Sequence, residues 1–301
     1  MSNPKVSIII PTYNREDLIQ RAIKSITGQT NQDYEIIIAD DASTDNTEEV
    51  IKSIQNSKII YFKLDKNSGQ CVSRNLAIKK ARGEYIGFLD SDDEWMPEKI
   101  EKQTKVFENS EDPNLGAVYC GFIEKDEVMD RTEIINRDNL KGDIYKNLLS
   151  GFCPSTPTMF LVKKSILDEV NGFDEGLPTF VDYDLWLRIA KLGYTFDYVD
   201  EPLIVKYEHA GEQIAKNLEK RKKGLSLFIE RWGEEMTNKI GFKNFEAFKR
   251  YKVEVLVKSL IEKPGADYKN DMKEALRLLK DVNSRNLKLF LKIQKLRFLG
   301  K

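Results

Sequence analysis

Short apolar runs alternate with helix-like apolar stripes along the first 90 residues. Residues 6–10 form a β-branched run, residues 17–26 carry apolar side chains at helical spacing, and residues 34–39 form a second apolar run. A strand, a helix and a strand in this order indicate a parallel pair. The alternation continues with predicted strands at 58–64 and 85–90 and predicted helices up to Ile54 and at 73–81. We therefore expect an α/β fold with a doubly wound, mixed but mainly parallel sheet.

Polar residues follow three of the predicted strands. They are Pro11, Thr12 and Tyr13 after the first strand, Asp40 and Asp41 after the second, and Asp90, Ser91 and Asp92 after the fourth. Pro11 should end the first strand, because proline cannot continue a central strand. Ligands of doubly wound sheets bind outside the carboxyl ends of the strands, so we expect these residues to converge on one crevice.

The densest charge lies at Asp90, Asp92 and Asp93, directly after an apolar run. If the strand stays extended through Asp92, the side chains of Asp90 and Asp92 point to the same side. Two carboxylates at one spot repel each other unless a cation lies between them, and Mg²⁺ or Mn²⁺ prefers such oxygen ligands. The alternative is a solvated acidic turn before the helix that Pro97 begins.

The net charge of −1 hides an uneven distribution. Residues 1–211 hold 25 Lys and Arg against 37 Asp and Glu, whereas residues 212–301 hold 23 against 12. Residues 212–232, 245–261, 272–282 and 287–299 are helical by periodicity. The sequence thus predicts an acidic α/β domain at 1–211 and a basic helical region at 212–301, with no nucleic-acid partner.

The last 17 residues are basic and amphipathic. Residues 285–301 hold six basic side chains and no acidic one. On a helix, Leu289, Ile293 and Leu296 form one stripe and Lys288, Lys292 and Lys295 the next. This pattern is typical of segments that bind an anionic membrane surface, and docking on the rest of the protein is the alternative.

Several classes of protein are not supported. No run approaches the roughly 18 apolar residues of a membrane span, and residues 1–11 lack a leader pattern. We therefore expect a cytoplasmic protein, either free or peripheral on the inner face of the membrane. The cysteines, Cys71, Cys120 and Cys153, are too scattered to indicate disulfides or zinc. The glycine motifs of P-loop and dinucleotide-binding proteins are absent.

Five groups of residues appear in a familiar order and spacing. They are residues 6–15 (VSIIIPTYNR), 40–45 (DDASTD), 67–69 with 73–75 (NSG and SRN), 89–93 (LDSDD), and 172–174 followed by 181–188 (GFD and VDYDLWLR). Together they resemble the family 2 glycosyltransferases, which have the GT-A fold. The resemblance implies a metal-dependent, inverting transfer of sugar from a nucleotide-sugar donor, most often UDP-linked, to an acceptor hydroxyl.

The resemblance also assigns roles to single residues. The nucleotide falls to Pro11, Thr12, Tyr13 and Asp41, with Asp40 in support; Arg74 faces the diphosphate, Asp90 and Ser91 contact the donor, and Asp92 binds Mn²⁺ or Mg²⁺. The chemistry agrees, since a Tyr ring can lie on a base and an Arg fork matches phosphate oxygens. The alternatives are surface packing for Tyr13 and a solvated helix position for Arg74.

Two further roles concern the metal and the general base. The family often has Tyr-x-His near the metal, so His209 is predicted as a metal ligand, an ordinary surface histidine being the alternative. Asp182 and Asp184 lie about 200° apart on a helix, so they cannot both face the crevice. Arg188 offers Asp184 a surface ion pair, which leaves Asp182 as the predicted base, or else as a helix N-cap. Where the family usually has Glu-Asp, this chain has Val181-Asp182.

The sequence thus predicts a glycosyltransferase that acts on a saccharide or lipid-linked acceptor in cell-surface polysaccharide or glycolipid assembly. Two rival hypotheses remain. A sugar-phosphate nucleotidylyltransferase would need a glycine-rich basic loop after the first strand, which Pro11-Thr12-Tyr13 is not. A non-catalytic subunit that binds sugar nucleotides would fit the missing Glu.

Overall fold

The computed structural model describes residues 3–127, 129–135, 139–154, 156–208, 217–262, 268–282, 284, 286, 289 and 291–293. The chain divides into two compact units. The first comprises Met1–Tyr145, Cys153–Gly176 and Val181–Ala210, and the second Lys146–Phe152, Leu177–Phe180 and Gly211–Lys301. Two short segments of the second unit therefore come from within the α/β part of the sequence.

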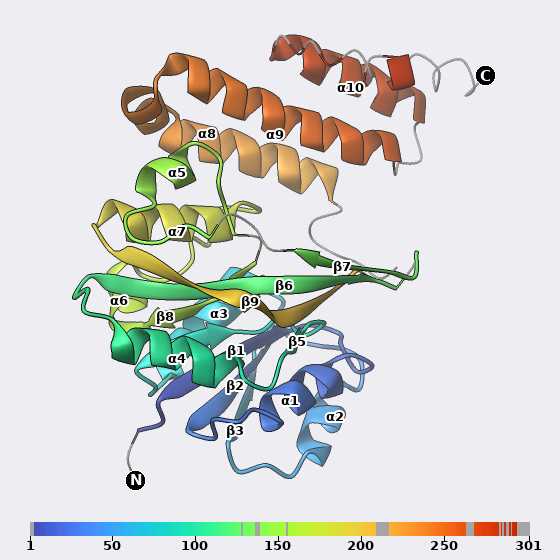
Figure 1. Cartoon of the computed structure of the whole chain (residues 1–301). Coiled ribbons are helices and arrows are strands. Elements are labelled where there is room, and N and C mark those ends of the chain that lie inside the picture. Colours follow the sequence, from blue (N-terminus) through green and yellow to red (C-terminus); the bar gives the residue numbers. More distant parts are fainter. Residues whose placement is uncertain are drawn as a thin grey trace. The chain divides into compact units, whose positions relative to one another are not determined.

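The first unit is built on one mixed sheet, which has nine strands when counted over the described residues (Figure 1). Its order is β3-β2-β1-β4-β8-β6-β9-β5, with β7 added beside β6. The strands β3, β2, β1 and β4 are parallel, β8 is antiparallel to both of its neighbours, and β6 runs parallel to β9. The strands are β1 (Val6–Thr12), β2 (Tyr34–Asp40), β3 (Ile59–Lys63), β4 (Tyr85–Phe88), β5 (Glu94–Trp95), β6 (Leu115–Asp126), β7 (Arg131–Ile135), β8 (Leu161–Lys163) and β9 (Thr195–Glu208).

The helices cover the sheet with the apolar faces that the sequence predicts. In α1 the residues Ile19, Ala22, Ile23 and Ile26 are all buried. The helix α3 packs on β1 and β2, α4 packs on β6 and β9, and α1 packs on β5. The helices of this unit are α1 (Ile19–Thr27), α2 (Thr47–Ser53), α3 (Gln70–Lys80), α4 (Lys99–Asn109), α6 (Lys164–Glu169) and α7 (Val181–Lys191), with a 3₁₀ turn η1 (Pro157–Met159). The short helix α5 (Tyr145–Leu149) lies where the chain passes into the second unit.

Pro11 does not end the first strand, contrary to the sequence prediction. It lies inside β1 and pairs with Ala39 of β2. The carbonyl oxygen of Ile9 accepts from Leu89 N, so Pro11, two residues on, turns its missing N–H toward the same side. Because β4 ends at Phe88, no strand needs that N–H, and the proline costs the sheet no hydrogen bond.

Three other boundaries differ from the sequence prediction. The strand β4 stops at Phe88, and the carboxylates after it lie in a turn closed by Asp93 N and Asp90 O at 3.0 Å. The two apolar segments 196–199 and 203–207, which the charged residues 200–201 separate in sequence, form one strand, β9, whose register against β6 shifts where Gly121 faces Pro202. The charged residues 124–126 continue β6 and residues 131–135 form β7, although the charged positions of this hairpin show no period-2 apolar pattern.

The second unit consists of helices. They are α8 (Leu218–Ile240), α9 (Phe242–Glu262) and α10 (Tyr268–Asp281), and Gly241 between the first two has φ 84°, which favours glycine. Leu289 and Ile293 are buried in an apolar cluster with Leu256, Val257 and other residues of this unit. This part of the predicted apolar stripe therefore docks within the second unit, which is the alternative to a membrane role for these two side chains. Over the described residues, none of the helices is long and apolar enough to cross a membrane.

Lys99 lies buried in the first unit, and its ammonium group meets Gln103 Oε1 and the Trp95 ring, 4.2 Å from the ring centre. Burial lowers the pKa of Lys99 to about 8. Between that value and the ordinary 10.5 the unfolded state binds one more proton than the native state, so the free energy of unfolding should rise with pH in this window. The cost of the buried charge, about 3 kcal/mol, is fully present below pH 8.

Lys99→Met should therefore remove a rise in the free energy of unfolding of up to about 1.4 kcal/mol per pH unit within this window. Urea denaturation of the wild type and of Lys99→Met at pH 7.5 and 9.5 measures the rise in each protein. Because the two proteins share all other titrating lysines, the difference between the two rises reports Lys99. An equal rise in the two proteins would contradict the assignment.

Candidate active site

Thr12, Asp41 and Asp90 lie at the carboxyl ends of β1, β2 and β4, which follow one another in the sheet in the order β2-β1-β4. Two other predicted site residues lie on helices, Arg74 on α3 and Asp182 on α7. The ends of β1 and β2 are tied together by Asp41 N, which donates to Thr12 O at 2.8 Å. The chain after β4 forms the turn at residues 90–93, called the acidic turn below. The parallel order of these strands thus brings Thr12, Asp41 and Asp90 to one edge of the sheet, as the sequence analysis expects.

Asp40 and Asp41 both support the backbone around them. Asp40 is fully buried; its Oδ1 accepts from Ser43 N and its Oδ2 from the Tyr61 hydroxyl, both at 2.8 Å. The two carboxylate oxygens of Asp41 accept from Ser68 N and Gly69 N, each at 2.7 Å. These bonds fix the loop that leads into α3. The sequence analysis did not predict this structural role for Asp41.

Thr12 and Tyr13 leave polar and aromatic groups available beside these carboxylates. Thr12 Oγ1 is buried and has no hydrogen-bond partner within the described part of the chain. The Tyr13 side chain is 41% exposed. An exposed ring next to an unsatisfied hydroxyl suits a planar, hydrogen-bonding ligand.

Arg74 is a deeply buried positive charge at this edge. It is 2% exposed, its Nη2 donates to Asp90 Oδ1 at 2.6 Å, and its Nη1 lies 3.8 Å from Asp182 Oδ1. Its Nε and Nη1 are buried and make no hydrogen bond to the residues that the structure describes. The alternative of a solvated helix position is therefore wrong. A buried guanidinium with unused donors is rare unless a further acceptor binds there.

The acidic turn is held by two threonines that the sequence analysis missed. Thr156 Oγ1 donates to Asp90 Oδ2 at 3.1 Å, and Thr158 Oγ1 donates to Asp93 Oδ2 at 3.2 Å. Thr158 Oγ1 also accepts from Asp90 N at 3.2 Å. Thr156 is the N-cap of η1 and Thr158 is its second residue, more than 60 positions away in sequence, so no local pattern could have found them.

The turn also changes the argument about Asp90 and Asp92. Ser91 and Asp92 occupy its centre, so the alternation of an extended strand does not apply and that step of the sequence analysis was wrong. The charges of the three carboxylates nevertheless interact with one another. Burial raises the pKa of Asp93 well above its ordinary value, and the charges of Asp90 and Asp92 raise it further. A cation near Asp92 would relieve this repulsion.

The donor set for a metal is incomplete within the described residues. Among them, no three His, Cys, Asp or Glu side chains are grouped so as to hold a metal ion. The other predicted ligand, His209, lies outside the described residues. A hard cation at Asp92 would gain further oxygen ligands from a bound diphosphate, since Mg²⁺ is usually held by one or two carboxylates together with substrate phosphates.

Asp182 and Asp184 face different surroundings, as their spacing predicts. Asp184 is fully buried and accepts from Arg188 Nε at 2.7 Å, and the same arginine donates to Val170 O and Gly172 O. The predicted pair is therefore present, but it is a buried clamp on the turn after α6 rather than a surface pair.

Asp182, by contrast, meets Arg74 and has an unused buried oxygen. It is the second residue of α7, its side chain is 28% exposed, and its Oδ1 makes no hydrogen bond to the described residues, so it does not act as an N-cap. Burial raises the pKa of Asp182 to about 6, against the charge of Arg74, which lowers it, while Asp90 raises it. A carboxylate with this pKa is charged at neutral pH and ready to accept a proton.

Asn75, which follows Arg74 in α3, holds the turn at Gly172 in place. Its Nδ2 donates to Phe173 O at 2.9 Å, and its Oδ1 accepts from Phe173 N at 2.8 Å. A Cβ on Gly172 would lie 2.3 Å from Asn75 Oδ1, and Gly172 also has φ 63°, so only glycine fits there. Packing alone therefore accounts for one residue in each of two sequence motifs, Asn75 in 73–75 and Gly172 in 172–174.

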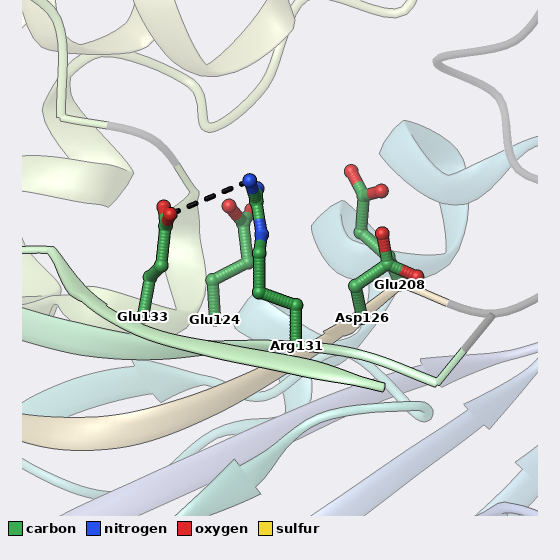
Figure 2. A pocket seen from close by; sticks show the side chains of 5 residues that line it. All are labelled: Glu124, Asp126, Arg131, Glu133 and Glu208. Atoms are coloured by element: carbon green, nitrogen blue, oxygen red, sulfur yellow. Dashed lines mark ion pairs between the residues drawn. The ribbon is translucent and has the colours of Figure 1, made fainter. Parts of the chain in front are cut away.

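A separate pocket lies on the β7-β6-β9 part of the sheet. Its lining residues are Glu124, Asp126, Arg131, Glu133 and Glu208. Figure 2 shows their side chains on one face of the sheet, with the ion pair between Arg131 and Glu133 at 3.4 Å. At about 60 Å³ it has room for a few water molecules rather than a nucleotide sugar, and it includes none of the predicted site residues.

Comparison with known proteins gives the family. Residues 7–170 match the family model for glycosyl transferase family 2, and the chain therefore belongs to that family. An uncharacterized glycosyltransferase of Methanocaldococcus jannaschii is 35% identical over 211 residues, which cover 69% of this chain and 71% of that protein. The putative teichuronic acid biosynthesis glycosyltransferase TuaG of Bacillus subtilis is 29% identical over 71% of this chain and 82% of its own length. Other relatives are longer: the chain spans 27% of a Rickettsia bellii glycosyltransferase and 22% of a Pasteurella multocida chondroitin synthase.

Solved structures confirm the fold. The mannosyltransferase PcManGT of Pyrobaculum calidifontis has a TM-score of 0.60 at 18% identity, with 100% of this chain and 89% of that one covered. TarS of S. aureus has a TM-score of 0.59 at 17% identity, with 91% and 81% covered. The predicted GT-A fold, a mixed sheet followed by C-terminal helices, is the fold of this chain.

Proposed function

We propose that the protein is an inverting glycosyltransferase that moves a sugar from a nucleotide-sugar donor to an acceptor hydroxyl. The observation that carries the proposal is the group of Arg74, Asp90 and Asp182 at the carboxyl edge of the sheet. It combines a buried guanidinium with unused donors and a carboxylate whose pKa is about 6. One suits a diphosphate and the other a proton transfer.

In this reaction the acceptor oxygen attacks the anomeric carbon of the donor sugar. Asp182 takes the hydroxyl proton as the new carbon–oxygen bond forms, and the bond from the anomeric carbon to the diphosphate breaks with its electron pair on the leaving oxygen. Attack from the side opposite to the leaving group inverts the configuration at that carbon. The unused Arg74 donors would then bind phosphate oxygens, and Asp90 would share this arginine with the donor.

A divalent cation, Mn²⁺ or Mg²⁺, fits this site at Asp92. Bound there, the cation would neutralise charge that builds up on the leaving diphosphate. Support comes from Asp93, whose pKa is raised by burial and further by the charges of Asp90 and Asp92, and from the solved mannosyltransferase, whose complex contains GDP-Man and Mn²⁺. His209 remains a predicted further ligand.

The donor is proposed to be UDP-linked. The relatives and neighbours support a nucleotide sugar but differ in the nucleotide: TarS was solved with UDP-GlcNAc and PcManGT with GDP-Man. An Escherichia coli relative, 38% identical over 44% of this chain, is named as a UDP-Glc-dependent glucosyltransferase that acts on a diphosphoundecaprenol-linked sugar. Thr12, Tyr13 and Asp41 would hold the base.

The acceptor is proposed to be a saccharide or a lipid-linked saccharide of cell-surface polysaccharide or glycolipid assembly. Support comes from the names of relatives, which include a putative teichuronic acid enzyme and a chondroitin synthase. A lipid-linked acceptor would place the protein in the cytoplasm at the inner face of the membrane, where the basic residues of 285–301 could contact anionic lipid.

Charge substitution tests this membrane contact better than truncation does, because Leu289 and Ile293 are buried and removing them would open the apolar cluster. Exchanging Lys288, Lys292 and Lys295 for Gln should weaken binding to vesicles that contain phosphatidylglycerol by roughly a hundredfold, at about 1 kcal/mol per lysine. Neutral vesicles serve as the control. Equal binding of both proteins to the acidic vesicles, measured by co-sedimentation, would refute the contact.

A donor screen tests the proposed activity. The protein is incubated with Mn²⁺ and each of a set of UDP-, GDP- and dTDP-sugars, and the release of free nucleoside diphosphate is measured. We expect turnover with at least one UDP-sugar. Tight binding of a nucleotide sugar without release would favour the non-catalytic subunit instead.

A further inference from the structure

Arg21 of α1 also contacts the acidic turn, in addition to the threonines of η1. Its Nη2 donates to the backbone carbonyl of Asp92 at 2.8 Å, and its Nη1 pairs with Glu127 Oε1 at 3.2 Å. Its Nε lies 3.4 Å from Glu94 Oε1. One guanidinium therefore joins α1 to the turn, to the start of β5 and to the end of β6.

The same guanidinium stacks on Tyr207, near the end of β9. Its central carbon lies 3.6 Å from the centre of the ring. Tyr207 is in turn bound to the acidic turn, because its N–H donates to Asp93 Oδ1 at 3.2 Å and its hydroxyl donates to Glu94 Oε1 at 2.9 Å. Arg21 thus contacts both the acidic turn and β9 at the place where Tyr207 joins them, and all of these residues belong to the first unit.

Only an arginine can make these contacts together. The planar fork presents a face to the Tyr207 ring while its edge donates to Asp92 O and Glu127, whereas a lysine ammonium has neither a flat face nor a fixed fork. The side chain is also 28% exposed, so its charge is not trapped in the core and its loss need not unfold the domain.

We propose that Arg21 is a positioning residue, whose guanidinium fixes the backbone of the acidic turn against the end of β9 and so sets the Asp92 carboxylate for metal binding. This inference rests on the proposed metal role of Asp92. No motif used in the sequence analysis includes Arg21, and it touches none of the proposed donor-binding side chains directly.

The test compares the wild type, Arg21→Met, Arg21→Lys and the control Arg82→Met. Arg82 is a suitable control because it clamps Glu35 at 2.6 and 2.9 Å before β4 begins, at the end of that strand remote from the acidic turn. Two quantities are measured: the affinity for Mn²⁺ alone, by electron paramagnetic resonance, and the amide hydrogen exchange of peptides that cover residues 90–96 and 203–208. Neither requires turnover.

For Arg21→Met we expect Mn²⁺ binding weakened by roughly tenfold to a hundredfold, the usual effect of losing a residue that orients a metal ligand. Exchange in both peptides should speed up, because Asp93 N and Tyr207 N lose the support of the clamp. Arg21→Lys should resemble Arg21→Met, and Arg82→Met should change neither quantity.

Three results would overturn the inference. They are unchanged exchange in Arg21→Met, faster exchange with unchanged Mn²⁺ affinity, and full recovery in Arg21→Lys. If the wild type itself binds no Mn²⁺, the proposed metal role of Asp92 fails instead, and the exchange data alone then decide whether Arg21 fixes the turn.

Discussion

Asp182→Asn is expected to lower kcat by at least about a hundredfold while the affinity for the nucleotide sugar stays nearly unchanged. The amide cannot accept the acceptor proton, and a positioned general base typically contributes roughly 10²–10⁴-fold. Arg74 keeps its short bond to Asp90, so the donor side of the site should persist. Steady-state kinetics together with calorimetric titration of the donor separates the two effects.

The pKa of Asp182 gives this prediction a pH signature. Because the carboxylate must be charged to act, kcat/KM of the wild type should fall about tenfold per unit below about pH 6, and this limb should vanish in the variant. The raised pKa also means that the native state binds more protons than the unfolded state between 3.8 and about 6, so wild-type stability falls as pH rises through that window. Asp182→Asn should therefore be at least as stable as the wild type at pH 7.

Asp184→Asn is the matched control for this experiment. It removes a carboxylate two residues away that clamps Arg188, so we expect a loss of stability of about 3 kcal/mol, with kcat per folded molecule within a few-fold of the wild type. Wild-type turnover in Asp182→Asn, combined with a large loss in Asp184→Asn, would show that the roles are reversed.

Removal of the divalent cation is expected to have the second large effect. EDTA should abolish turnover, and Mn²⁺ or Mg²⁺ should restore it, because the leaving diphosphate would otherwise keep its full charge beside three carboxylates. Asp92→Asn should lose Mn²⁺-dependent donor binding while keeping its melting temperature, since the residue lies in a turn rather than in the core.

Glu133→Gln provides the comparison, because it neutralises an exposed carboxylate in the separate pocket. Its metal dependence should equal that of the wild type. Full activity of the wild type in EDTA would refute the metal role of Asp92, as would an unchanged Mn²⁺ requirement in Asp92→Asn.

The sequence predicts the central strands well because they are buried on both faces. The runs that became β1 and β2 are continuous and apolar, and all seven residues of β2 are buried. The hairpin of β6 and β7 could not be predicted in the same way, since Glu124, Lys125 and Glu133 carry no apolar alternation. Its pairing depends on contacts with β9 that are remote in sequence.

The site shows the same division between local and remote information. Asp182 could be separated from Asp184 by helix geometry and the spacing to Arg188. Three other features depend on contacts between distant segments and could not be predicted. They are the burial of Arg74, the bonds from the threonines at η1, and the bonds from Asp41 to the backbone before α3. The extended-strand argument for Asp90 and Asp92 failed because β4 ends two residues earlier than its apolar pattern suggests.

The stereochemistry of the product tests the central claim most directly. With a donor found in the screen, the configuration of the transferred sugar is followed by proton NMR, with either an acceptor or water as the nucleophile. The account predicts inversion, so that a donor with an α-linked sugar first gives a β-configured product, and Asp182→Asn should form it at least about a hundredfold more slowly. An α-configured first product would contradict direct displacement assisted by Asp182.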